Sequence, residues 1–191
     1  MLEVKHLAVN YRGVTAVDDV SFRSLPGQIV GVIGPNGAGK STMVKAILGL
    51  VPTTSGVVQF RSRALKQQLS SVAYVPQRSQ IDWDYPITVW NVVLMARTVH
   101  TGWFRAPSRP SQEIVKDALL RVGMLELRCL RRQATRQIGE LSGGQQQRVF
   151  LARALAQQAE LLFFTYLGVV SFFSSCSYSF DSKSIFISLS S

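Results

Sequence analysis

Acidic residues, histidine and cysteine are scarce in this sequence of 191 residues. The two cysteines, Cys129 and Cys176, form no CxxC pair, and the two histidines do not cluster with them. This scarcity argues against a zinc site and a disulfide scaffold, and it fits a reducing compartment. Only 11 Asp and Glu residues balance 21 Lys and Arg residues, which gives a net charge of +10. We therefore expect anionic partners, although surplus basic residues can also serve only to solvate a surface.

We also expect no signal peptide, because Met1–His6 contains no apolar run after a basic segment. The hydrophobic fraction of 47% and the charged fraction of 17% exclude a disordered chain. The uncharged stretch Leu161–Phe180 has the length of a membrane span. Because serines dilute its second half, we favour a buried strand followed by a serine-rich tail, with a transmembrane helix as the alternative.

Apolar runs bounded by turns predict a series of strands. They lie at Leu2–Tyr11, Val20–Phe22, Ile29–Ile33, Val57–Phe60, Val72–Val75 and Leu161–Phe164. The continuous run Ile29–Ile33 suits a strand buried on both faces of a parallel sheet. Helical spacing predicts helices from Ser41 to about Leu48, across much of Thr88–Arg136, and from Gly144 to about Gln158. The alternation of strands and helices indicates an α/β fold.

A glycine-rich loop separates the run Ile29–Ile33 from the first predicted helix. It matches G-x-x-x-x-G-K-[ST], the pattern of a phosphate-binding P-loop. Its residues are Gly34, Pro35, Asn36, Gly37, Ala38, Gly39, Lys40, Ser41 and Thr42. Glycines let backbone N–H groups converge on a phosphate, and the helix directs the positive end of its dipole there. We expect Lys40 to reach the β- and γ-phosphates of ATP, and Ser41 to hold Mg²⁺.

A second glycine pair stands far along the chain, at the start of a predicted helix. The segment consists of Leu141, Ser142, Gly143, Gly144 and Gln145. By itself, Ser142 is an ordinary helix cap, next to amides that an anion could use. Together with the P-loop, the segment resembles the signature of ABC ATPases. The resemblance covers roughly residues 1–164 and implies the ATP-binding subunit of a transporter.

The resemblance also implies how the site is assembled. In a head-to-tail homodimer, Ser142 and the backbone of residues 143–144 of one copy would contact the γ-phosphate held by Lys40 of the other. Tyr11 would stack on adenine, and Gln77 would sense Mg²⁺ and the attacking water. Tyr11 also fits a strand tyrosine packed on the core, and Gln77 also fits a solvated loop residue.

The segment Ile81–Val89 is similar to the ATPase subunits of bacterial manganese, zinc and iron importers. This similarity implies an integral membrane permease as a partner and, indirectly, a solute-binding protein. It places the subunit in the cytoplasm, peripheral on the inner face of the membrane. Asp82 and Asp84 would belong to the coupling surface, because two carboxylates without convergent oxygens make a poor cation cage. Polar amino acid and lipid transporters stay open as alternatives.

The sequence departs from the ABC pattern after Leu161–Phe164. ABC ATPases have Asp-Glu-Pro there, in which the Asp orders Mg²⁺ and the Glu is the general base. Thr165 and Tyr166 occupy these positions. Threonine carries no charge, and tyrosine, with a pKa of about 10, is a poor base at neutral pH. No catalytic residue is therefore identifiable, and since His6 and His100 lie far from where a switch histidine would fall, we expect poor ATP hydrolysis or none.

Residues 165–191 also differ in composition, with ten serines, four phenylalanines and no arginine. They show no helical period and no clear strand alternation. The simplest hypothesis is translation in a wrong frame, or past a splice junction or truncation. A second departure is Cys129–Thr135, which resembles a short basic insertion before the signature.

The expected fold is α/β: a P-loop NTPase core with an N-terminal β region, an inserted helical subdomain at about residues 88–145, and an incomplete C-terminus. The nucleotide-binding domain would span 1–164, and 165–191 would be a Ser/Phe-rich tail. One alternative is a catalytically inactive nucleotide-binding fragment. Another is a non-transport ABC ATPase acting on nucleic acid, which the charge favours slightly. A single short cassette argues against nucleic acid as the partner.

The frame hypothesis predicts that Asp-Glu-Pro codons follow codon 164 in another reading frame. Sequencing the gene through this region tests it directly. If neither shifted frame encodes these three residues, the tail is not a frame artefact.

Overall fold

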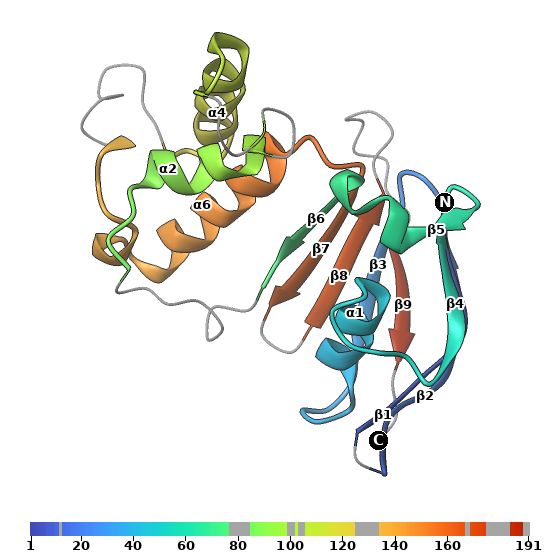
Figure 1. Ribbon diagram of the computed structural model, residues 1–191. Coiled ribbons are helices and arrows are strands. Elements are labelled where there is room, and N and C mark those ends of the chain that lie inside the picture. Colours follow the sequence, from blue (N-terminus) through green and yellow to red (C-terminus); the bar gives the residue numbers. More distant parts are fainter. Residues whose placement is uncertain are drawn as a thin grey trace. The chain divides into compact units, whose positions relative to one another are not determined.

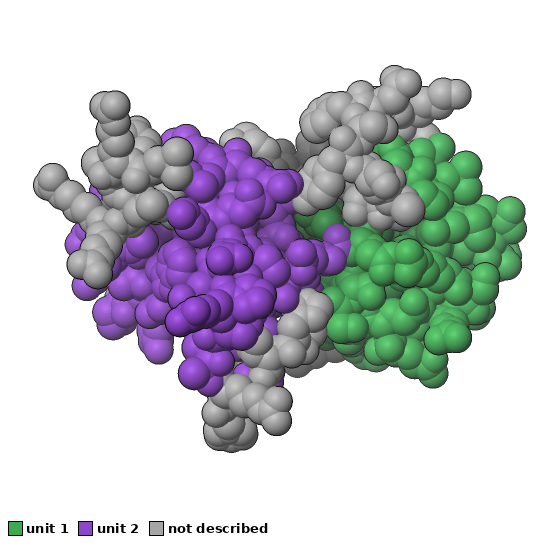
Figure 2. Space-filling view, turned by 90° about the horizontal axis from the view of Figure 1, so that it is seen from above, with its two compact units in different colours: residues 1–77, 160–191 green, residues 78–159 purple. Residues whose placement is uncertain are grey.

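The computed structural model describes residues 1–11, 13–76, 85–98, 102, 106–124, 134–166, 169–174 and 184–188. The chain divides into two compact units, coloured separately in Figure 2. Unit 1 comprises residues 1–77 and 160–191, and unit 2 comprises residues 78–159. Since the second unit interrupts the first, unit 2 is an insertion in the chain of unit 1.

Unit 1 holds two sheets. The first has the strand order β2-β1-β4-β5, with bounds β1 (Leu2–Tyr11), β2 (Val14–Ser24), β4 (Ser55–Phe60) and β5 (Arg63–Ala64). Its pairs are antiparallel. The strand expected at Val20–Phe22 is longer than predicted, because β2 pairs with β1 along most of its length.

A β-bulge explains why the apolar alternation of β1 is imperfect. The register with β2 and the register with β4 both shift just after Lys5. His6 has a φ of 48° there, and the extra residue moves the next side chains to the opposite faces. Val4 and Leu7, three apart in the sequence, are therefore both buried.

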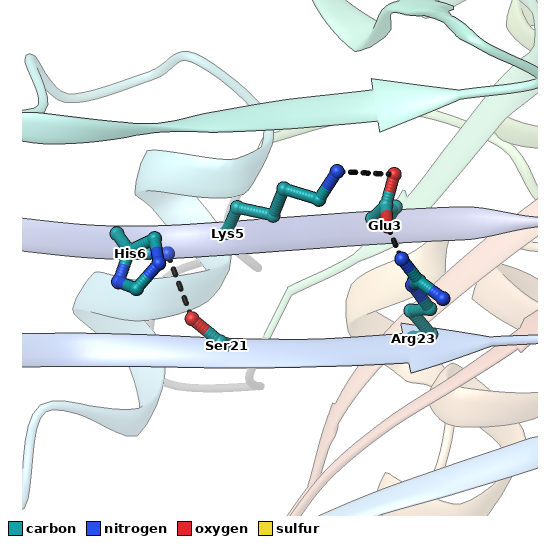
Figure 3. A network of polar contacts seen from close by, with 5 residues as sticks. All are labelled: Glu3, Lys5, His6, Ser21 and Arg23. Carbon is teal, nitrogen blue, oxygen red and sulfur yellow. Dashed lines mark hydrogen bonds and ion pairs between the residues drawn. The ribbon is translucent and has the colours of Figure 1, made fainter.

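Polar contacts beside the bulge join β1 to β2, as Figure 3 shows. The Lys5 ammonium lies 3.2 Å from the Glu3 carboxylate, and the Arg23 guanidinium donates to it at 2.5 Å. The hydrogen bond from Lys5 has the largest effect on the Glu3 carboxylate. Together with the hydrogen bond from Arg23, it holds the pKa of Glu3 below its ordinary value. The His6 N–H donates to the Ser21 hydroxyl at 2.8 Å, so a side chain of β2 satisfies a backbone donor that the bulge displaces.

The second sheet has the order β6-β7-β8-β3-β9 (Figure 1). Its strands are β3 (Ile29–Ile33), β6 (Val72–Val75), β7 (Leu161–Tyr166), β8 (Val169–Ser174) and β9 (Ser184–Ser188). β6 pairs with β7 and β3 with β9 in parallel, whereas β8 is antiparallel to both β7 and β3. The predicted strands at Ile29–Ile33 and Val72–Val75 are confirmed.

The composition of the tail suggested no strands, but the structure shows two there. β8 and β9 both fall within residues 165–191. Their segments, VVSFFS and SIFIS, are rich in β-branched and aromatic residues, which fit a pleated surface. The uncharged stretch considered as a membrane helix is likewise strand in β7 and β8. Within the part of the chain that the structure describes, no helix is long and apolar enough to cross a membrane.

Helix α1 (Lys40–Ile47) joins the two sheets of unit 1. It contacts β1 and β2 of the first sheet and β8 of the second. Its residues Met43, Val44 and Ile47 are at most 1% exposed and belong to a core that also contains residues of β1, β3 and β7. Gly49, with a φ of 73°, ends the helix, and the Leu50 N–H donates to the Lys45 carbonyl at 2.8 Å. Glycine commonly takes this left-handed position just after a helix.

Unit 2 is mainly helical in its described residues. Its α-helices are α2 (Val89–Leu94), α4 (Arg109–Arg121) and α6 (Gly143–Ala156), with the 3₁₀ turns η4 (Met95–Arg97) and η5 (Ile138–Glu140). Helices α2 and α4 both pack on α6. The buried Arg97 guanidinium donates to the Ala156 carbonyl at 3.0 Å and to Gln158 Oε1 at 2.9 Å, and burial lowers its pKa. It therefore satisfies the C-terminal end of α6.

The β1 bulge generates a prediction about Gly56. A Cβ there would lie 2.6 Å from the His6 carbonyl oxygen and 2.6 Å from the Leu7 Cα, and φ is 99°. Gly13 also has a positive φ, 86°, but nothing lies within 4 Å of its Cβ position. Gly13→Ala should cost about 1–2 kcal/mol of unfolding free energy from backbone strain. Gly56→Ala should cost roughly 1–3 kcal/mol more, because backbone atoms must move.

Urea unfolding of both variants measures this difference. Equal losses of stability in the two variants would show that β4 does not approach β1 so closely.

Candidate functional site

The P-loop leaves the carboxyl end of β3 and runs into α1. Its turn is closed by backbone bonds, since the Gly39 N–H donates to the Gly37 carbonyl at 2.7 Å. Gly37 and Gly39 have φ values of 92° and 79°, which explains why glycine stands at both positions. Helix α1 begins after Gly39 with no side-chain cap, whereas α2, α4 and α6 have hydroxyl caps at Thr88, Ser108 and Ser142. Among the described residues, the first amides of α1 therefore have no side-chain acceptor, and they suit an anion.

Lys40 carries the positive charge of this loop. The residue is only 6% exposed, and its Nζ donates to the Gly34 carbonyl at 2.7 Å and to the Pro35 carbonyl at 2.5 Å. The ammonium therefore faces the inner side of the loop rather than open solvent. Ser41 and Thr42 follow it and are half-buried at the start of α1. A phosphate bound by the loop would meet a cation, helix amides and a hydroxyl together.

The β1–β2 hairpin packs against the P-loop. A Cβ on Gly39 would lie 2.0 Å from the carbonyl oxygen of Ala16 in β2. The same hairpin carries Tyr11, which is 43% exposed and pairs with Val14. The aromatic ring expected to stack on adenine is thus exposed on the hairpin that touches the P-loop. Nothing in the sequence pointed to Ala16, because its contribution is a backbone carbonyl.

The carboxyl end of β7 lies at the same sheet edge as the P-loop. Because β8 is antiparallel to both β3 and β7, these two strands run in the same direction. Val32 and Thr165 both pair with Val170, so they lie two strand spacings apart, about 10 Å. Ligands of open α/β sheets bind at this edge. Thr165 and Tyr166 therefore occupy the place where a charged group could act on a nucleotide.

Thr165 is buried but its hydroxyl is unsatisfied. The residue is 6% exposed, and within the described ranges Oγ1 has no hydrogen-bond partner. A buried, unpaired hydroxyl costs stability. The sequence could not show this feature, because it depends on how β7 sits between its neighbours.

The signature segment of unit 2 forms the start of α6. Ser142 is the N-cap: its Oγ accepts from the Gln145 N–H at 3.4 Å, and Gln145 Oε1 accepts from the Ser142 N–H at 3.0 Å. This reciprocal pair is a capping box. Leu141 is buried and anchors the segment, while Ser142 and Gly144 are exposed. The amides of Gly143 and Gly144 have no side-chain acceptor among the residues that the structure describes, so an outside anion can approach them.

Several predicted residues lie outside the described residues. They are Gln77, Asp82, Asp84, His100 and most of the segment Cys129–Thr135. Among the described residues, no group of three or more His, Cys, Asp or Glu side chains could hold a metal ion. The structure brings together the P-loop, the Tyr11 hairpin and the end of β7. The signature lies in unit 2.

A P-loop at this sheet edge and a capped signature helix suggest one family, and comparison with known proteins decides it. The family model for ABC transporters matches residues 17–164. This chain belongs to the ABC transporter family. The match ends at Phe164, so Thr165 and the residues after it lie beyond it. The expected P-loop NTPase fold of ABC ATPases is thereby confirmed.

The curated relatives of this ABC protein include metal transport subunits. It is 48% identical over 163 residues to the manganese transport system ATP-binding protein MntB of Halalkalibacterium halodurans, covering 85% of this chain and 62% of that protein. It is 48% identical over 162 residues to the zinc transport system ATP-binding protein TroB of Treponema pallidum, covering 85% of this chain and 59% of that protein. The chain thus spans about six tenths of the length of these relatives.

Solved structures agree with the family. A metal-chelate type ABC transporter in an inward-facing conformation is 29% identical, with a TM-score of 0.70. The likeness covers 85% of this chain and 58% of that one.

The unpaired hydroxyl of Thr165 generates a testable prediction. Thr165→Val keeps the shape and removes the buried polar atom, so it should raise the free energy of unfolding by about 1 kcal/mol. Thr15→Val is the matched control, because Thr15 is an exposed strand threonine, and it should change stability by less than about 0.5 kcal/mol. Chemical unfolding of both variants measures the effect. A loss of stability in Thr165→Val would mean that the hydroxyl has a partner.

Proposed function

We propose that this chain is the ATP-binding subunit of a transporter that couples ATP binding and hydrolysis to import of a divalent metal ion, such as manganese or zinc. The observation that carries the proposal is the P-loop at the carboxyl end of β3. It combines the buried Lys40 ammonium with a helix start that no side chain caps. The names of the relatives MntB and TroB support the choice of metal. In this proposal the metal is the transporter's cargo and needs no ligand set in this chain.

The residues at and near the P-loop suit the nucleotide of Mg-ATP better than they suit its metal ion. The amides at the start of α1 and Lys40 would hold the β- and γ-phosphates, and Tyr11 would stack on adenine. Ser41 and Gln77 would bind Mg²⁺, which neutralises phosphate charge when bound. Thr165 offers the metal no charge, since its side chain is a neutral hydroxyl. Nucleotide binding is therefore better supported than metal-assisted hydrolysis.

The partners follow from membership of the ABC transporter family. We propose that two copies associate head to tail, as the resemblance of the P-loop and the signature to those of ABC ATPases implies. Ser142 and the amides of Gly143 and Gly144 would then face the γ-phosphate bound by Lys40 of the other copy. A membrane permease would bind this dimer, with a solute-binding protein as an indirect partner. The chain would thus lie in the cytoplasm, on the inner face of the membrane.

A catalytically inactive nucleotide-binding protein is the second candidate. Thr165 and Tyr166 stand at the end of β7, and neither residue type is a charged metal ligand or a carboxylate base. Threonine cannot accept the proton of an attacking water at neutral pH, and tyrosine accepts it poorly. The two candidates share ATP binding and differ in turnover.

Loss of the Lys40 charge should weaken nucleotide binding. Lys40→Ala removes the charge-assisted hydrogen bonds to the phosphates, so the dissociation constant for Mg-ATP should rise by roughly tenfold or more. Lys45→Ala removes the same charge from the last turn of the same helix and should leave the affinity within about twofold. Calorimetry with all three proteins tests this, and thermal unfolding without ATP verifies folding. Equal affinities in the two variants would contradict a nucleotide site at the P-loop.

Hydrolysis separates the two candidates. If the second candidate holds, the purified chain should release phosphate from Mg-ATP at the same rate as its Lys40→Ala variant, because Thr165 and Tyr166 are poor bases at neutral pH. Turnover that Lys40→Ala abolishes would contradict the inactive interpretation and support a coupled ATPase.

A further inference from the structure

The turn just before the signature is anchored to the start of α2. An isolated antiparallel bridge joins Thr88 to Gln137. Two backbone hydrogen bonds flank this bridge. The Ile138 N–H donates to the Ile87 carbonyl at 2.9 Å, and the Val89 N–H donates to the Arg136 carbonyl at 3.0 Å. Thr88 is also the N-cap of α2. The N-terminal side of η5 is therefore held firmly by backbone contacts.

Gln146 of α6 holds the same end of η5, because Ile138 is the first residue of that turn. The Gln146 Nε2 donates to the Ile138 carbonyl at 3.3 Å, and Gln146 is only 3% exposed. Gln146 is the one polar member of the buried face of α6. A buried amide needs hydrogen bonds to offset its desolvation. The contact closes a loop that begins at Ile138 and ends at Gln146, and this loop contains the whole signature.

The closed loop decides where the signature donors point. The capping box fixes Ser142 to Gln145 inside it. The direction of the Gly143 and Gly144 amides then depends on the angle between η5 and α6, which Gln146 bridges. Donors that act on a charged group lose their effect when they are misplaced by about an ångström.

We propose that Gln146 is a positioning residue that sets the direction of the signature donors in the ATP-bound dimer. It acts through the Ile138 carbonyl, because its side chain is buried between η5 and α6. The inference rests on the proposed head-to-tail association and extends it to a residue outside Leu141–Gln145. Removing the amide should leave each copy able to bind ATP but less able to close on its partner.

Neighbouring glutamines provide a matched pair of variants. Gln147 follows Gln146 in the same helix and is exposed. Methionine keeps the length of the side chain and removes the donor. The full chain should therefore be prepared as Gln146→Met and as Gln147→Met. Gln146→Asn, which keeps the amide but shortens its reach, is a milder variant should Gln146→Met fail to fold.

The first measurement is dimer formation in Mg-ATP, by sedimentation velocity over a range of protein concentrations. Gln146→Met should raise the dimer dissociation constant about tenfold, and Gln147→Met should leave it within about twofold. The affinity of the monomer for Mg-ATP, measured at low protein concentration, should be the same in both variants. A general folding defect would instead weaken both dimerisation and ATP binding. Equal dimerisation of the two variants would overturn the positioning role.

The second measurement is hydrogen exchange of residues 138–146 without nucleotide, read by mass spectrometry. Exchange should be faster in Gln146→Met than in Gln147→Met, because only the first variant opens the loop. Unchanged exchange in Gln146→Met would overturn the proposal. If the unaltered chain forms no dimer in ATP, the proposed function fails, and exchange still decides whether Gln146 holds the loop.

Discussion

The contact between Gly39 and Ala16 is the constraint on which the nucleotide end of unit 1 depends. The Ala16 carbonyl lies where a Cβ of residue 39 would be, so no other residue type allows the P-loop to approach β2 this closely. Because the loop is pressed onto the first sheet, the hairpin with Tyr11 is brought to the start of α1. That helix contacts strands of both sheets, which links the loop to a single core. The conformation of the P-loop and the packing of unit 1 are thus one arrangement.

Strand direction decides which residues share the site. β3 and β7 run the same way, although the strand between them runs the opposite way. The carboxyl ends of β3 and β7 therefore lie at one edge of the sheet. The P-loop with Lys40 follows β3, and Thr165 follows the apolar residues of β7. The edge combines a cation and helix amides with a neutral hydroxyl. The proposed preference for nucleotide binding over hydrolysis rests on this imbalance, because Thr165 is a poor base at neutral pH.

Much of the site could be predicted from local patterns. The glycines of the P-loop predicted a backbone that can converge on a phosphate, and Ser142 predicted a capped helix. In the structure Gly37 and Gly39 have positive φ values, and Ser142 caps α6. The strands β8 and β9 were missed, because serines interrupt the apolar alternation on which strand prediction relies. The bulge at His6 was visible only as an irregular alternation, since its cause is the joint register of three strands.

The sequence by itself determined the family, the P-loop, the signature and the neutral residues at 165 and 166, because each depends on residue type and local order. Only the tertiary structure decided that Ala16 supports the P-loop, that the Thr165 hydroxyl is buried without a partner among the described residues, and that Gln146 closes the signature loop. These features depend on backbone atoms and on contacts between different helices, strands and turns. No local pattern of residue types records such contacts, since they arise only when strands pair and helices pack.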